Sequence, residues 1–296
     1  MTQRFLDPDV LTSLSGLELI ARTVVNGFVA GLHRSPEFGF SQEFAEYRAY
    51  SPGDDLRHVD WNVYARTERA YIKRYRGETN MQLTVLLDAS GSMRFQSHAT
   101  SKMDYARYAA ASLFYLALHS QHDAAGMIVF DDEVRSYVRP STRTGQFARL
   151  LSALEVAEPG ARTDFAKPTL HFQEFLRRRG LAVFLSDFYE SPEVLMRAIE
   201  PLRYIGNEVV LLHVLDPQEV RPDLREPSIL IDLETQQQME VTPDYAKFEY
   251  RDKMAAHIAA LRERCRAADV DYFLLETDRP LDAMLRQYLS IRHERK

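Results

Sequence analysis

From Gln82 onward, short apolar runs alternate with longer segments in which apolar residues recur every three or four positions. The short runs predict six strands, over Gln82–Asp88, Gly126–Phe130, Glu133–Val138, Leu181–Ser186, Glu208–Val214 and Val270–Leu275. The periodic segments predict helices over Lys102–His122, Phe147–Val156, Phe172–Arg179, Pro192–Tyr204 and Asp244–Ala268. Only Asp131 and Asp132 separate the second strand from the third, which predicts a tight hairpin and one antiparallel edge strand. The other strands are joined by helix-sized connections, so we expect a doubly wound, mostly parallel six-stranded α/β sheet.

The first 80 residues follow a different pattern. The elements predicted there are a helix over Gly16–Val29, a strand at the alternating Phe38 and Phe40, and a strand over Tyr71–Arg76. We therefore predict an N-terminal helix/β arm over residues 1–80 and an α/β domain over residues 81–296. Within that domain, residues 217–242 are predicted to form an inserted hairpin that pairs Ser228–Leu233 with Gln238–Val241.

Composition excludes several classes of function. The chain has 296 residues, of which 45% are apolar and 27% charged, as in ordinary soluble domains. A net charge of −6 gives no electrostatic reason to expect a nucleic-acid or anionic-membrane partner. The single cysteine, Cys265, excludes an internal disulfide and a cysteine-based metal centre. The N-terminal sequence lacks the apolar run of a signal peptide, and the longest apolar run, Tyr108–Leu118, is about half the length that a bilayer requires. We therefore expect a cytoplasmic protein without membrane insertion.

Candidate chemistry gathers where the first predicted strand of the sheet ends, in the sequence LLDASGSM. Asp88 leaves the strand at its carboxyl end, which is where open α/β sheets bind their ligands. Ser90 and Ser92 follow at alternate positions, with Gly91 between them to permit a turn. Oxygen ligands of this kind suit a hard cation such as Mg²⁺, or Mn²⁺ in its place. Taken alone, the motif also fits a helix N-cap.

Two further loops are expected at the same edge. The predicted strand Leu181–Ser186 also ends on an acid, Asp187, and the connection PGARTDF supplies the hydroxyl of Thr163 beside Asp164. Each of these loops alone fits a helix cap, whereas together they form a coherent oxygen site. The predicted metal-binding residues are Asp88, Ser90, Ser92, Thr163 and Asp187.

This constellation resembles the metal-ion-dependent adhesion site of von Willebrand factor A-type (VWA) domains. The upstream sequence YRAYSPGDDLRHVDWNVYARTERAYIKRY resembles the signature of a bacterial family catalogued as domain of unknown function family 58, often encoded beside MoxR-type AAA+ ATPases. The resemblance extends from about residue 30 to about residue 290. It implies a non-enzymatic adhesion or adaptor protein that acts with such an ATPase in chaperone-like remodelling or complex assembly.

The resemblance also implies a role for each residue of the site. Ser90 and Ser92 would bind the cation directly, Thr163 directly or through water, and Asp88 and Asp187 mostly through water. One coordination position would stay open for an Asp or Glu of a partner protein. The chain departs from the pattern after Asp187, because Phe188–Tyr189 stands where many adhesion domains have a glycine. Aromatic rings at the rim would either narrow access to the metal or add contact area for a partner.

The segment around the only tryptophan, Trp61, is dense in charge and fits two roles. It forms either an ion-pair network that anchors the arm, which we favour, or a recognition surface, since Trp and Arg are typical interface anchors. The candidate partner-contact residues are Asp54, Asp55, Arg57, Trp61, Arg66, Phe188 and Tyr189.

Two alternatives to the adhesion module stay open. The first is a magnesium-dependent phosphatase-like hydrolase with Asp88 as nucleophile. Such enzymes usually need a second acid two residues later, where this chain has Ser90, and a lysine for the phosphoryl group, for which Lys167 is a poor candidate. The second is a metal-independent scaffold protein.

Overall fold

The computed structural model describes residues 8–12, 16–32, 44–50, 59–75, 81–160, 166–233 and 236–294. The chain forms two compact units, residues 1–29 with 81–296, and residues 30–80. The sequence predicted one arm over residues 1–80, whereas in the structure the first 29 residues group with the α/β domain and only residues 30–80 form a separate unit. Helix α1 (Pro8–Thr12) places Thr12 Oγ1 2.9 Å from Thr100 Oγ1, and helix α2 (Leu17–Leu32) buries an apolar side.

The larger unit contains a six-stranded sheet in the order β10-β7-β6-β3-β4-β5. Its strands are β3 (Gln82–Asp88), β4 (Ala124–Phe130), β5 (Val134–Ser141), β6 (Leu181–Ser186), β7 (Glu208–Leu215) and β10 (Asp271–Glu276). Every neighbouring pair is parallel except β4 with β5, which is antiparallel. The predicted fold class is thereby confirmed. The chain moves from β3 to β4 and later returns to place β6 on the other side of β3, so β3 lies at the topological switch point.

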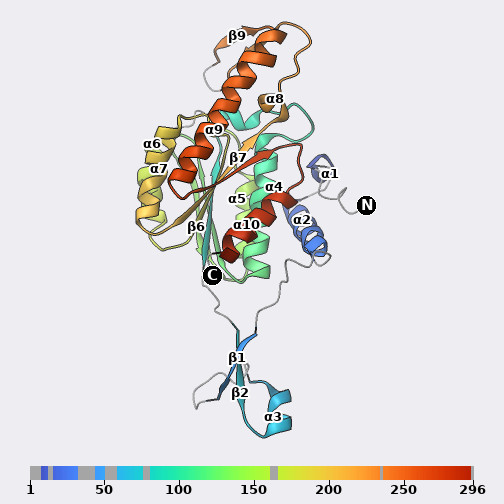
Figure 1. Cartoon of the computed structure of the whole chain (residues 1–296), viewed down its shortest axis with the longest axis vertical. Helices are drawn as coiled ribbons and strands as arrows, with labels where there is room; N and C mark the ends of the chain where they lie inside the picture. Colours follow the sequence, from blue (N-terminus) through green and yellow to red (C-terminus); the bar gives the residue numbers. More distant parts are fainter. Residues whose placement is uncertain are drawn as a thin grey trace. The chain divides into compact units, whose positions relative to one another are not determined.

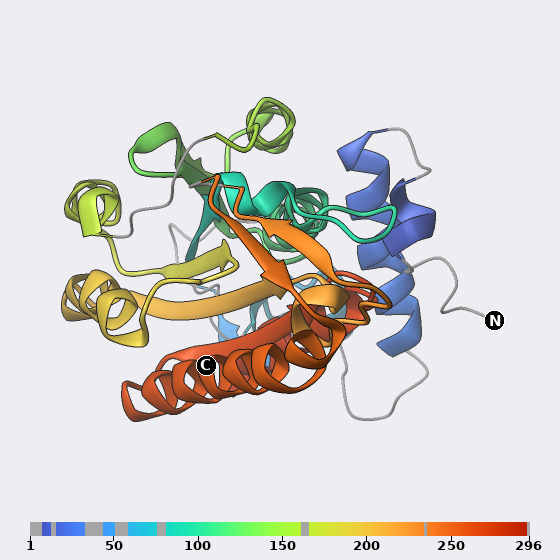
Figure 2. The ribbon, with the colours of Figure 1, turned by 90° about the horizontal axis from the view of Figure 1, so that it is seen from above.

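Helices cover both faces of this sheet (Figures 1 and 2). On one face lie α4 (Lys102–Tyr115), continued by the π-helical turn η4 (Leu116–Ser120), together with α5 (Gln146–Glu155) and α10 (Asp282–Glu294). On the other lie α6 (Ala166–Phe175), α7 (Pro192–Tyr204) and α9 (Arg251–Ala267), the last preceded by the π-helical turn η5 (Tyr245–Tyr250). Within the described residues, no helix is both long and apolar enough to cross a membrane.

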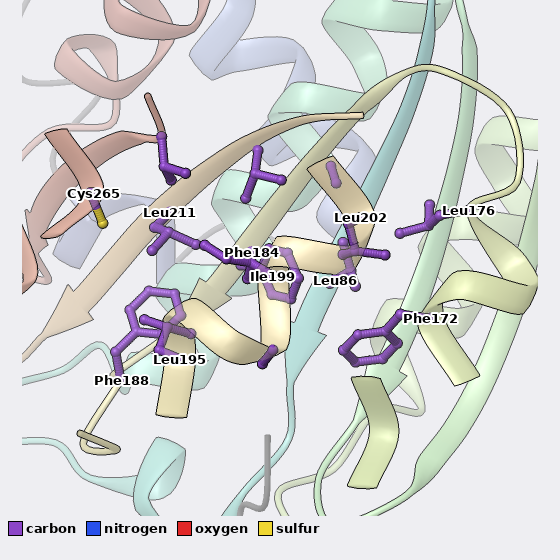
Figure 3. Packing of buried hydrophobic residues seen from close by; sticks show 14 of the residues in the cluster. Leu86, Phe172, Leu176, Phe184, Phe188, Leu195, Ile199, Leu202, Leu211 and Cys265 are labelled. Atoms are coloured by element: carbon purple, nitrogen blue, oxygen red, sulfur yellow. The ribbon is translucent and has the colours of Figure 1, made fainter. Parts of the chain in front are cut away.

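The core on the second face explains why the strands read as continuous apolar runs. Leu86, Phe184 and Leu211 project from three adjacent strands towards the helices, where they meet side chains such as Phe172 and Ile199 (Figure 3). Because helices cover both faces, residues of both alternating sets are buried, and β6 is buried at all six positions. The single cysteine, Cys265, is also part of this core.

Two smaller elements complete the chain. The predicted inserted hairpin is present as β8 (Ser228–Ile231) paired antiparallel with β9 (Gln238–Val241), and it follows the short helix α8 (Pro217–Val220). In the smaller unit, β1 (Phe44–Ala49) pairs antiparallel with β2 (Tyr71–Tyr75), and α3 (Trp61–Thr67) lies between them in sequence. The strand predicted at Phe38 and Phe40 lies outside the described residues.

Candidate metal site at the carboxyl edge of the sheet

The exits of β3 and β6 meet at the carboxyl edge of the sheet. Because Leu87 pairs with Leu185 in a parallel register, the two strands end at the same level. Asp88 Oδ2 accepts a hydrogen bond of 2.5 Å from Ser186 Oγ, and Asp88 Oδ1 accepts one of 2.8 Å from the backbone N–H of Ser90. The strand-end carboxylate therefore joins the two exit loops directly.

The two predicted hydroxyl ligands lie together beside this carboxylate. Ser90 Oγ is 3.0 Å from Ser92 Oγ, and Ser92 belongs to a short 3₁₀ helix, η3 (Gly91–Arg94). The loop is anchored from both sides, since Ala89 donates its N–H to Phe130 O of β4 and accepts the N–H of Gly160, each at 2.7 Å. Thr163 and its neighbour Asp164 lie outside the described residues, so the place of Thr163 in the site stays a prediction.

Asp88 is in an unfavourable electrostatic position for an anion. Its side chain is fully buried, and burial, followed by the negative charge of Asp187, raises its pKa from 3.8 to about 7. The hydrogen bonds from Ser186 and Ser90 oppose this rise only in part. A cation beside Asp88 would stabilise its charged form. Hydroxyl and carboxylate oxygens are also the donors that Mg²⁺ prefers, so this set fits a hard cation.

The set differs from a site built of strong anionic or nitrogen ligands. Over the part of the chain that the structure describes, no three His, Cys, Asp or Glu side chains converge as a metal-binding group. Of the predicted ligands, Ser90 and Ser92 are neutral, and Asp187 already contacts an ammonium group. Any cation held here would retain much of its positive charge.

That ammonium group belongs to Lys102, which the sequence reasoning did not single out. Its Nζ lies 2.8 Å from Asp187 Oδ2 and 2.6 Å from Glu219 Oε1, and its side chain is fully buried. Burial by itself lowers the pKa of Lys102, but the two carboxylates outweigh it and leave this pKa raised. A lysine therefore does lie at this edge. Its ammonium group contacts the carboxylates of Asp187 and Glu219 and is shielded from solvent, which argues against a role in holding a phosphoryl group.

A second set of hydrogen bonds ties the site to α8. Asp216, the N-cap of α8, accepts hydrogen bonds from the backbone N–H and the hydroxyl of Ser97, at 2.8 and 2.5 Å. Glu219 closes the capping box by accepting the Asp216 N–H at 2.8 Å. The loop between η3 and α4 is therefore held against the start of the inserted segment.

The two aromatic residues after Asp187 have different environments. Phe188 is fully buried in the core, with a left-handed φ of +43°, and its carbonyl oxygen lies 2.8 Å from His257 Nε2. The expectation that its ring stands at the rim is therefore corrected, because a buried ring offers no area to a partner. A φ in this range is one that glycine adopts at no steric cost and that larger residues adopt rarely. Tyr189 is 47% exposed and donates its hydroxyl to Glu219 Oε1 at 2.8 Å.

In the smaller unit, Trp61 presents an exposed aromatic surface. Its side chain is 58% exposed, and it packs edge-to-face on Tyr64, itself 44% exposed, with 6.0 Å between ring centroids. Arg66 is exposed in the last turn of the same helix. The other partner-contact candidates of this segment, Asp54, Asp55 and Arg57, lie outside the described residues.

The fold of this chain is similar to that of a protein of solved structure. The chain is similar to BatB from Bacteroides thetaiotaomicron, with a TM-score of 0.52 and 15% identity over 72% of this chain and 99% of that one. At this identity the likeness shows the fold alone. The VWA domain of SpRpn10 matches 45% of this chain and 75% of that domain at 16% identity, with a TM-score of 0.37, which carries no argument by itself.

Sequence comparison identifies the family. The uncharacterized protein Rv1480 of Mycobacterium tuberculosis is 30% identical over 295 residues, which span 97% of this chain and 90% of that protein. The uncharacterized protein Mb1516 of Mycobacterium bovis matches to the same extent. The model of the family described as "Protein of unknown function DUF58" matches residues 46–264. This chain therefore belongs to the DUF58 family.

Proposed function

We propose that this protein is a non-enzymatic, metal-dependent protein-binding module. Its Mg²⁺ or Mn²⁺ site would be formed by Asp88, Ser90, Ser92, Thr163 and Asp187. The observation that carries the proposal is the meeting of Asp88, Ser90 and Ser92 at the switch point of the sheet, with a fully buried carboxylate whose pKa is raised to about 7. This arrangement brings oxygen donors to one point and leaves a negative charge that a cation would compensate.

The charge balance of the site favours an anionic partner group. The hydroxyls of Ser90 and Ser92 add no charge to a cation, and Lys102 neutralises part of the charge of Asp187. A bound cation would therefore supply an electrophilic position for an Asp or Glu carboxylate of another protein. Carboxylate binding to such an ion is a strong, charge-assisted contact, which suits reversible recognition by one side chain.

The proposed partner is a MoxR-type AAA+ ATPase, and the proposed setting is the cytoplasm. The ATPase rests on the family resemblance rather than on any residue of this chain. In this role the protein would act as an adaptor, connecting the ATPase to the assembly or remodelling of another complex.

Capture of a partner tests the proposal directly. Wild type and Asp88→Asn would be immobilised and incubated with lysate of the source cells, in Mg²⁺ or in EDTA. Asp132→Asn is the matched control, because it removes a half-buried carboxylate from the adjacent β4–β5 turn. We expect one protein to be retained by wild type and by the control in Mg²⁺ only, and lost with Asp88→Asn. Equal retention under all conditions would exclude the metal site as the binding surface, and assays for phosphatase activity would then follow.

A further inference from the structure

The β8–β9 hairpin exposes more apolar surface than a short two-stranded element usually does. Ile229 is 63% exposed and Ile231 50%, on β8, and Met239 on β9 is 48% exposed. The register places Leu230 opposite Met239, so these two share one face, while Ile229 and Ile231 project to the other. Both faces of the hairpin therefore carry exposed apolar side chains. Contiguous exposed apolar surface of this kind is typical of an interaction site.

The outer edge of β8 is also open to pairing. Among the described residues, β8 and β9 form a sheet of two strands and pair with no third one. The sequence of β8, SILI, contains none of the charged residues or prolines that protect natural edge strands. An isolated two-stranded hairpin is only marginally stable in water, and a third strand would stabilise it.

The hairpin lies at the same edge of the sheet as the candidate metal site. It follows β7 through α8, and it lies beyond the end of the sheet at which β7 leads into α8 (Figure 1). The preceding helix α8 is fixed at this edge by Glu219, which contacts Lys102, and by its N-cap Asp216, which accepts hydrogen bonds from Ser97. The hairpin and the candidate metal site therefore share one end of the α/β unit.

The charge of the hairpin indicates what kind of strand it accepts. Residues 228–241 contain no Lys or Arg but three acids, Asp232, Glu234 and Glu240. A second copy of the hairpin would present the same net negative charge over residues 228–241. A strand flanked by basic residues would instead meet opposite charge.

We propose that the β8–β9 hairpin binds an extended, apolar segment of a partner protein that is flanked by Lys or Arg, and that this segment adds to β8 as a third strand. Backbone hydrogen bonds would supply affinity, and the apolar side chains and acids would supply selectivity. The inference goes beyond the proposed function, and rests on it only in placing the hairpin and the metal within one interface.

The test uses the full chain and a fluorescent peptide of alternating Val and Thr with Lys at both ends. One comparison peptide carries Glu in place of Lys, and another is N-methylated along one edge, which removes ladder hydrogen bonds without changing charge. The protein variants are Ile231→Lys and, as matched control, Tyr204→Lys, which alters an 85% exposed residue at the end of α7. Binding is followed by fluorescence anisotropy, and circular dichroism checks that each variant is folded.

We expect wild type and Tyr204→Lys to bind the Lys peptide at least about tenfold more tightly than the Glu peptide. Ile231→Lys and N-methylation should each abolish binding, because one repels the peptide and the other removes its hydrogen bonds. Absence of binding, or equal binding of all peptides, would overturn the inference. The inference would also be overturned if the wild type self-associated and Ile231→Lys abolished this self-association, because the surface would then bind a second copy of the chain. A different result would reject the proposed function and leave the hairpin inference standing. In that case the peptide would still bind in EDTA and to Asp88→Asn, and the capture of a partner from lysate would also be unchanged by EDTA and by Asp88→Asn.

Discussion

The charge of Asp88 should make the stability of the metal-free protein depend on pH. The pKa of this fully buried carboxyl is raised from 3.8 to about 7, so the folded protein keeps a proton that the unfolded chain has released. Between about pH 4 and pH 7 the unfolded state therefore binds fewer protons, and the free energy of unfolding falls as pH rises. A rise of about three pKa units at about 1.4 kcal/mol each corresponds to a loss of about 4 kcal/mol.

Asp88→Asn isolates this contribution. Asparagine retains an acceptor for the Ser90 N–H but has no charge to bury. The stability of the Asp88→Asn protein should therefore lack this part of the pH dependence. Urea unfolding in EDTA would be measured for both proteins from about pH 4 to about pH 8. We expect the stability of the variant relative to wild type to increase by about 4 kcal/mol across that range. Other groups, such as Glu219, are common to both proteins and cancel in the difference.

The reasoning would be refuted if the stability difference between Asp88→Asn and wild type changed by less than about 1 kcal/mol over this pH range. Such a result would mean that ionisation of Asp88 has no energetic cost in the folded protein. Adding Mg²⁺ provides a second comparison. A cation that binds beside the ionised carboxylate should raise the stability of wild type most above about pH 7, and that of Asp88→Asn much less. Asp132→Asn is again the control for loss of a carboxylate at this edge.

Other predictions concern the surroundings of the site and the sheet. Lys102→Met should cost about 3–5 kcal/mol of unfolding free energy by leaving Asp187 and Glu219 without their buried cation, and adding Glu219→Gln should recover part of this in a double-mutant cycle. Phe188→Ala should lose about 3–4 kcal/mol in urea unfolding, since its ring is fully buried, and an unchanged midpoint would contradict that burial. Gly126→Ala should lower the melting temperature, because a Cβ there would lie 2.5 Å from Pro140 Cγ and force β5 away from β4, at a cost of about 1–3 kcal/mol. A melting temperature equal to wild type would show that β5 adjusts freely.

Local pattern predicted most of the sheet. The apolar runs located all six strands to within about three residues, because the inner strands β3, β4, β6 and β7 are covered on both faces and are therefore apolar at nearly every position. Connection length predicted the direction of pairing, since a connection as short as the three residues between β4 and β5 permits only a hairpin. The order of residues in DASGS was enough to select Asp88, Ser90 and Ser92, because hydroxyls at alternate positions of one loop are near each other whatever surrounds them.

The contacts of Lys102 and the burial of Phe188 could not be predicted from the sequence pattern, because they depend on residues distant in the sequence. Lys102 was predicted only as the first residue of a helix, whereas tertiary packing places it against Asp187, 85 residues later, and Glu219, 117 residues later. Phe188 resembled a rim aromatic, but the backbone at the end of β6 takes a left-handed conformation and its ring packs in the core.

The sequence by itself therefore determined the strands, their directions and the oxygen-rich loop, since these follow from periodicity and short spacing. Tertiary structure alone decided which charges pair, which aromatic ring is buried, and that the first 29 residues join the α/β unit. The physical reason is that burial changes the energy of a charge or a ring by several kcal/mol, and burial is a property of the assembled fold rather than of neighbouring residues.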